Sequence, residues 1–144
     1  MTNPTQIARD RFAEGFNCSQ AVFCAFASKF GINDGTALKL ASPFGGGVAH
    51  QGQVCGAVTG ALMALGLARG SDTVETKDET YRMAEDFISR FQERHDTILC
   101  RELIGVDIST PEGLQSARDT GVFKSICPGL VKDAAELAAE FIDK

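Results

Sequence analysis

The sequence lacks the features that several large classes of protein require. It has no uninterrupted apolar run long enough to cross a bilayer, so membrane insertion is not expected. Its formal net charge is −5 with mixed signs, and it has no basic stripe of the kind that binds DNA or RNA. No Pro/Ser-rich linker or charge run divides the chain, which predicts one domain over residues 1–144.

Two further absences concern the N-terminus and the cysteines. The first residues lack the basic-then-apolar order of a secretion signal, so we expect a cytoplasmic protein. In a reducing compartment, five cysteines are more often catalytic, redox-active or metal-binding than joined in structural disulfides. No two of them have the Cys-x-x-Cys spacing of a thioredoxin-like site, a zinc knuckle or a haem attachment site. Haem and ordinary zinc-finger interpretations therefore lose most of their support.

What the sequence does contain is helix signals along nearly its whole length, without the alternation typical of strands. We therefore expect an all-α, compact, multi-helical fold. The predicted helices begin at or beside a residue that can cap them and cover 3–15, 17–31, 34–42, 55–68 and 72–95. A short helix capped by Asp96 or Thr97 holds Cys100 in or near its first turn and ends at Gly105, and two more helices begin at Thr110 and Cys127. Asn3 with Gln6, Asn17 with Gln20, and Asp72 with Glu75 have capping-box spacing. The helix after Asn17 is apolar on nearly every side and belongs at the centre of the domain.

A Gly-rich stretch, residues 44–52, precedes the helix that begins at Cys55. Its three consecutive glycines allow close approaches of the chain to a site, although a plain connection between helices is an equal alternative. It is not a phosphate-binding loop, because no Gly-Lys-Ser/Thr follows.

The helix after Cys55 presents a surface of small residues that includes Gly56, Ala57 and Gly60. Another helix can approach such a surface closely. Each glycine inside a helix lowers the stability of the helix by roughly 1 kcal/mol relative to alanine, so another interaction has to offset this loss. Either tight packing or room beside Cys55 for a reacting partner would offset it.

Four cysteines, Cys18, Cys55, Cys100 and Cys127, fall within about a turn of predicted helix N-termini. Free backbone N–H groups and the positive end of the helix dipole favour a thiolate there. A thiolate is both the nucleophile of thiol exchange and the form that binds metal, so both chemistries stay open. Cys24 lies among apolar residues, and we expect it to be a small buried hydrophobe.

The two histidines are weaker signals. His50, five residues before Cys55, is a candidate base or fifth ligand, although a lone loop histidine is more often polar surface. His95 lies near the end of its helix, where it most simply interacts with the C-terminal carbonyls of that helix.

The order of these residues resembles a known family. Cys55-Gly56-Ala57-Val58-Thr59-Gly60, with Cys18 upstream and Cys100 and Cys127 downstream, resembles the C_GCAxxG_C_C family along the whole chain. The resemblance implies a small all-helical bacterial or archaeal protein with a redox role. It makes Gly56, Ala57 and Gly60 the small residues of the motif, and we expect these three residues to help bind any cofactor. The family is also similar to the cluster-bearing part of split-Soret cytochromes, which makes a homodimer an expectation by analogy.

Two functions follow, with a third alternative. In the first, Cys55 has a lowered pKa and attacks the disulfide of a redox partner protein or a small thiol compound, and another of the four cysteines resolves the mixed disulfide. This would make the protein a thiol–disulfide oxidoreductase. In the second, all four cysteines hold one [2Fe–2S] cluster or a structural zinc, although their long separations lean against zinc. The third is a helical domain with unreactive buried thiols.

Overall fold

The computed structural model describes residues 3–143, so Met1, Thr2 and Lys144 of the predicted domain lie outside the described residues. The expected all-α fold is confirmed: residues 3–143 contain helices and one isolated antiparallel bridge, Val54 with Leu99, but no strand. None of the helices in this range combines the length and apolar character that a bilayer span requires.

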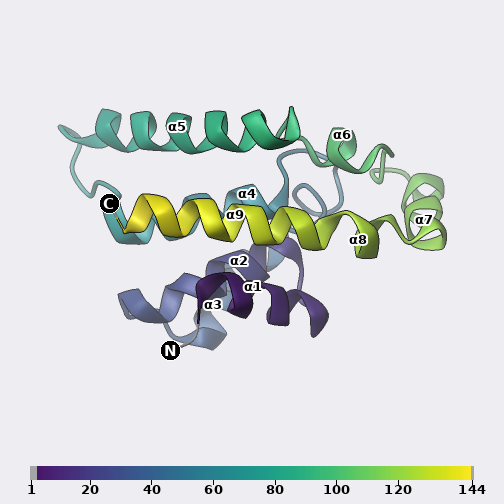
Figure 1. Ribbon diagram of the computed structural model, residues 1–144, viewed down its shortest axis with the longest axis horizontal. Helices are drawn as coiled ribbons and strands as arrows, with labels where there is room; N and C mark the ends of the chain where they lie inside the picture. Colours follow the sequence, from purple (N-terminus) through teal and green to yellow (C-terminus); the bar gives the residue numbers. More distant parts are fainter. Residues whose placement is uncertain (1–2, 144) are drawn as a thin grey trace.

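Nine α-helices follow one another along residues 3–143. They are α1 (Pro4–Ala13), α2 (Cys18–Ala27), α3 (Asp34–Ala41), α4 (Gly56–Arg69), α5 (Lys77–His95), α6 (Cys100–Ile104), α7 (Pro111–Thr120), α8 (Val122–Ser125) and α9 (Cys127–Ile142), with 3₁₀ turns at Ser28–Phe30 and Ser42–Phe44. In Figure 1, α9 lies between two groups of helices. On one side of it α5 runs antiparallel to α9, and on the other side lie α1, α2 and α3. The short helix α8 was not expected from the sequence.

The centre of the fold is α2, as its sequence predicts. Every residue from Ser19 to Ala27 except Gln20 is buried, and the helix packs against α1, α3, α4 and α9. Its start is a capping box: the Asn17 side chain accepts from the Gln20 N–H, and the Gln20 side chain accepts from the Asn17 N–H. This cap fixes where α2 begins, and with it the position of Cys18.

Of the capping box predicted for Asn3 and Gln6 at the start of α1, only the side-chain cap by Asn3 is present. Asn3 accepts a hydrogen bond from the backbone N–H of Thr5, so its capping role is confirmed. Gln6 does not return the bond, because its amide donates instead to Asp10 one turn further along the helix, at 2.8 Å.

The predicted capping box of Asp72 and Glu75 is wrong. Helix α5 begins later, at Lys77, and its N-cap residue Thr76 makes no side-chain cap bond to the helix. The hydroxyl groups of Ser71, Thr73 and Thr76 bond to one another instead and order the turn before the helix. Local hydroxyl bonds of this kind compete with a helix start.

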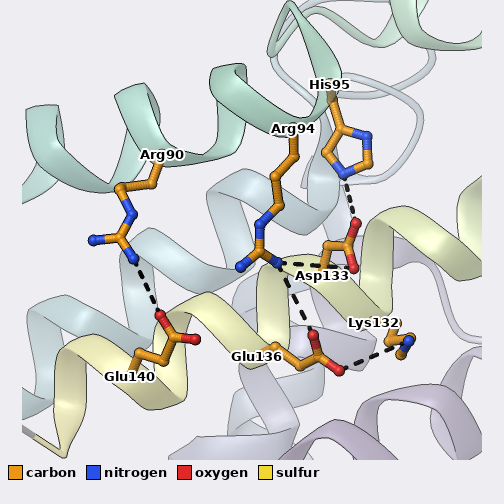
Figure 2. Close-up of polar contacts among 7 residues, drawn as sticks. All are labelled: Arg90, Arg94, His95, Lys132, Asp133, Glu136 and Glu140. Carbon is orange, nitrogen blue, oxygen red and sulfur yellow. Dashed lines mark hydrogen bonds and ion pairs between the residues drawn. The ribbon is translucent and has the colours of Figure 1, made fainter.

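The prediction for His95 is also wrong. Its Nε2 lies 2.8 Å from Asp133 Oδ2 on α9, so the ring pairs with a neighbouring helix. Figure 2 shows this contact at one end of a row of charged side chains between α5 and α9, with Arg90 and Glu140 at the other end, 3.3 Å apart. Arg94, between them, lies 4.0 Å from Asp133 and so joins the same row. Side chains from two helices therefore fix the pairing of α5 with α9.

The small-residue surface of α4 packs closely against α2. Tight packing, one of the two explanations offered for the glycines of this helix, is therefore confirmed. A Cβ on Gly60 would lie 2.6 Å from the carbonyl oxygen of Ser19, and one on Gly56 would lie 3.1 Å from the Cβ of Cys18. Ser19 is fully buried in this contact, where its hydroxyl lies 3.2 Å from that of Thr59. The glycines thereby hold the starts of α2 and α4 side by side.

Candidate functional site

The four cysteines of the motif, Cys18, Cys55, Cys100 and Cys127, all lie at helix N-termini, as expected. Helices α2, α6 and α9 begin at Cys18, Cys100 and Cys127, and Cys55 is the N-cap residue of α4. We call these residues the motif cysteines. Each is therefore held by the backbone of a helix start, and the packing of the helices decides which sulfurs meet.

A short antiparallel contact joins the starts of α4 and α6. The N–H of Cys55 donates to the carbonyl of Ile98 at 2.7 Å, and the N–H of Cys100 donates to the carbonyl of Gln53 at 2.6 Å. These two bonds flank the bridge between Val54 and Leu99. Cys55 and Cys100 thus lie diagonally across one short contact, close enough to interact electrostatically, although they are far apart in the sequence.

The loop that leads into this contact has an unusual backbone. Residues 46–50 all have positive φ, and three of them are Val48, Ala49 and His50, at 66°, 51° and 63°. Such a conformation costs an L-residue roughly 1–2 kcal/mol. Hydrogen bonds across the loop hold it, among them Gln53 N–H to Gly47 O at 2.9 Å. A Cβ on Gly47 would lie 2.7 Å from the Cβ of Cys100, so this glycine lets the loop close over that cysteine.

The sulfur atoms of the motif cysteines form one cluster. The thiols of Cys18 and Cys127 interact with each other through hydrogen bonding, and each of the other pairs among the four is close enough to interact electrostatically. Cys24 has no such interaction with them. It is buried, as expected, and burial raises its pKa to about 11. All five cysteines are free thiols in this structure.

The structure does not favour the expected thiolate at three of the motif cysteines, because the pKa of each is raised. Burial raises the pKa of Cys55 to about 11, and the N–H groups of Ala57 and Val58 at the start of α4 offset this only in part. Burial likewise raises the pKa of Cys100 to about 12. The pKa of Cys18 is raised because its proton is held in the hydrogen bond to Cys127.

Cys127 is the exception among the motif cysteines. Its pKa is lowered, because its sulfur accepts the hydrogen bond from Cys18. It also occupies the first turn of α9, a 16-residue helix whose N-terminal N–H groups favour a negative charge. The lowered pKa that the sequence predicted for Cys55 is therefore found at Cys127 instead.

The motif cysteines line one open pocket of about 800 Å³. Its walls include apolar side chains from α1, α6, α7 and α8, and Gly46, Gly47 and His50 from the strained loop. Gly56 lines the pocket, but Ala57 and Gly60 are buried in the core and are not part of its wall. A binding role for those two residues stays a prediction. His50 is exposed and lies beside the pocket, where it stays a candidate base or ligand.

The arrangement does not provide a ready ligand set for a metal ion. Within residues 3–143, no group of three or more His, Cys, Asp or Glu side chains is gathered closely enough to hold one. We therefore derive no chemical step through a metal. Binding of a [2Fe–2S] cluster or zinc by the motif cysteines stays a prediction that metal analysis can test.

Sequence reasoning missed the residues that surround the cysteines. Arg9 on α1, Arg118 on α7 and Lys124 on α8 all line the pocket, and Phe123 lines it beside Lys124. No motif marks them, and they meet only because residues of α1, α7 and α8 line the same pocket in the folded chain. The only local signal is that Lys124 lies three residues before Cys127.

The comparisons with known proteins give one match. Residues 16–141 match the family described as "Putative redox-active protein (C_GCAxxG_C_C)". Neither the curated proteins nor the solved structures contain a match. The family match covers most of the chain and includes all four motif cysteines. The chain therefore belongs to the C_GCAxxG_C_C family.

Proposed function

We propose that the protein is a thiol–disulfide redox protein in which Cys127 and Cys18 form the reacting pair. The observation that supports this most strongly is that the thiols of Cys18 and Cys127 interact in one pocket, and that this interaction lowers the pKa of Cys127 alone among the motif cysteines. One sulfur is then poised as a thiolate, and a second thiol lies beside it. Membership of a family described as redox-active agrees with this function.

The reaction follows from the state of the two sulfurs. The Cys127 thiolate attacks one sulfur of a substrate disulfide, the substrate S–S bond breaks, and the leaving thiolate takes a proton from solvent. The Cys18 thiol then loses its proton and attacks the Cys127 sulfur of the mixed disulfide, releasing the second substrate thiolate. Two electrons pass from the protein to the substrate, which leaves as two thiols, and the protein keeps a Cys18–Cys127 disulfide.

Cys55 and Cys100 have a later role in this proposal. Their pKa values of about 11 and about 12 keep both protonated near neutral pH, so neither is the first nucleophile. Both lie within electrostatic range of Cys127. They form a second dithiol that can exchange with the first disulfide once it has formed.

Trapping of the mixed disulfide tests the order of attack. With Cys18→Ser, the resolving thiol is gone, and the mixed disulfide on Cys127 should accumulate in intact-mass spectra. With Cys127→Ser, it should form much more slowly. Cys24→Ser is the matched control, because Cys24 is a buried cysteine of α2 that does not interact with the cluster, and it should behave like the wild type. Equal trapping by Cys127→Ser and the wild type would refute the assignment.

The alternative function, metal binding by the motif cysteines, is supported by one observation. Four thiols line one pocket, which is the number of ligands that a [2Fe–2S] cluster or a structural zinc takes. Protein purified without oxygen would then carry about two irons or one zinc per chain. Its thiols would also be protected from alkylation. A folded protein that has neither metal and four reactive thiols in the pocket would support the exchange function instead.

A further inference from the structure

We infer that the substrate of the thiol pair is a small disulfide that carries anionic groups such as carboxylates, and that Arg9, Arg118 and Lys124 recognise those groups. This inference rests on the proposed function. It adds the chemical class of the substrate and three residues that determine specificity, which we call the pocket cations.

The burial of the cysteines favours a small substrate. Cys55, Cys100 and Cys127 are 3%, 8% and 6% exposed, so their sulfurs can be approached only through the pocket. A cavity of about 800 Å³ is within the range of small-molecule sites. A small disulfide can enter this pocket and approach the Cys127 sulfur more readily than a disulfide held in the folded surface of another protein.

The charge of the pocket favours an anion. All three pocket cations are exposed at its wall, and within residues 3–143 none of them forms an ion pair. By contrast, Arg11, on the same helix as Arg9, lies 2.8 Å from Asp34. The one carboxylate in the pocket wall, Asp10, already accepts a hydrogen bond from Gln6. The pocket is thus a positive region in a chain whose net charge is −5.

Much of the rest of the wall is apolar. The apolar side chains in the wall include Phe12, Leu103, Leu114 and Phe123. A substrate with a short hydrocarbon chain between its sulfur and its charged group would bury that chain against these residues. Its anionic end would then lie among the pocket cations while its sulfur faces Cys127. Pocket walls that are mostly apolar, with a few charged groups that set orientation, are typical of small-molecule sites.

The electron balance is that of the proposed reaction. The Cys127 thiolate attacks one sulfur of the anionic disulfide, and Cys18 displaces the second half. The substrate gains two electrons and leaves as two thiols, while the protein gains one disulfide. The pocket cations take no part in the bond changes. They raise the local concentration of the substrate and offset the repulsion between its charge and the Cys127 thiolate.

Three small disulfides of similar length and different charge test the inference. They are 3,3′-dithiodipropionate, 2-hydroxyethyl disulfide and cystamine, which are dianionic, neutral and dicationic at neutral pH. The rate of Cys127 oxidation is measured with each on the intact protein, and each rate is divided by that of 2-mercaptoethanol with the same disulfide. We expect the normalised rate to be at least roughly tenfold higher for the dianion than for the dication at low ionic strength. The ratio should fall in 1 M salt, where the screening length is about 3 Å.

Charge-removing variants connect this preference with the pocket. Arg118→Gln combined with Lys124→Gln should remove most of the preference for the dianion and leave the rate with the neutral disulfide nearly unchanged. Arg82→Gln is the control, since Arg82 is an exposed arginine of α5 that does not line the pocket. It should leave all three rates as they are in the wild type.

The outcomes separate the two proposals. If Cys127 reacts with all three disulfides at equal normalised rates, or fastest with cystamine, the inference about the substrate is refuted and the redox function stands. If Cys127 reacts with none of them while the protein is folded, the proposed function itself fails. A preference for the dianion that persists in the Arg118/Lys124 double variant would refute the assignment to these residues.

Discussion

Replacement of Gly60 by alanine tests the close contact that holds α2 beside α4. The added Cβ would lie 2.6 Å from the carbonyl oxygen of Ser19 and 3.2 Å from the backbone N of Phe23. Both are backbone atoms of a buried helix and cannot rotate away. Overpacking of this kind costs about 1–3 kcal/mol, and alanine regains roughly 1 kcal/mol of helix propensity. We expect a net loss of about 1–2 kcal/mol in the free energy of unfolding.

Gly66 provides the matched control on the same helix. A Cβ there has no atom within 4 Å, so Gly66→Ala adds only the helix propensity. It should raise the free energy of unfolding by about 0.5–1 kcal/mol. Urea titrations followed by circular dichroism measure both variants. Gly60→Ala should also slow the oxidation of Cys18, the residue before Ser19, because a wider gap between α2 and α4 shifts its sulfur. A Gly60→Ala protein as stable as Gly66→Ala would refute the packing argument.

Three further predictions follow from the site and its supports. Iodoacetamide modifies thiolates, so the lowered pKa of Cys127 should bring its half-maximal labelling at a lower pH than that of Cys55, which should need a pH near 11. Peptide mass spectrometry at each pH can check this order, and equal labelling profiles for the two residues would contradict it. Asp133→Asn should lower the free energy of unfolding by about 0.5–1 kcal/mol, because His95 loses a partly exposed charged partner; an unchanged urea midpoint would contradict this. Gly47→Ala should lower it by at least about 1 kcal/mol, since the residue has φ +68° and no room for a Cβ, and a neutral result would mean that the loop can move away from α6.

The positions of the helix starts could be predicted because capping is local. Asn17 with Gln20, Thr110 before Pro111, and Cys127 before Pro128 each mark a helix start within a few residues. The same local rule failed at Asp72, where neighbouring hydroxyl groups bond to one another rather than to a helix. Short-range signals thus place the motif cysteines correctly but do not say which of them touch.

The chemistry of the thiols could not be predicted from helix ends alone. The helix start favours a thiolate at Cys55, but the burial of that sulfur depends on how α4 packs, and burial is the larger effect. The lowered pKa of Cys127 depends on Cys18, which is more than a hundred residues away in the sequence. The pocket cations likewise come from three helices and share no motif. Each of these features depends on tertiary contacts, which spacing in the sequence does not record.

The most direct test of the central claim is to identify the first disulfide that forms. The reduced protein is equilibrated without oxygen in buffers of stepwise rising oxidised-to-reduced thiol ratio, quenched with acid, alkylated and mapped by peptide mass spectrometry. The account predicts that the Cys18–Cys127 disulfide appears first, while Cys24 stays reduced throughout. A first disulfide that joins Cys55 to Cys100, or one that includes Cys24, would contradict it.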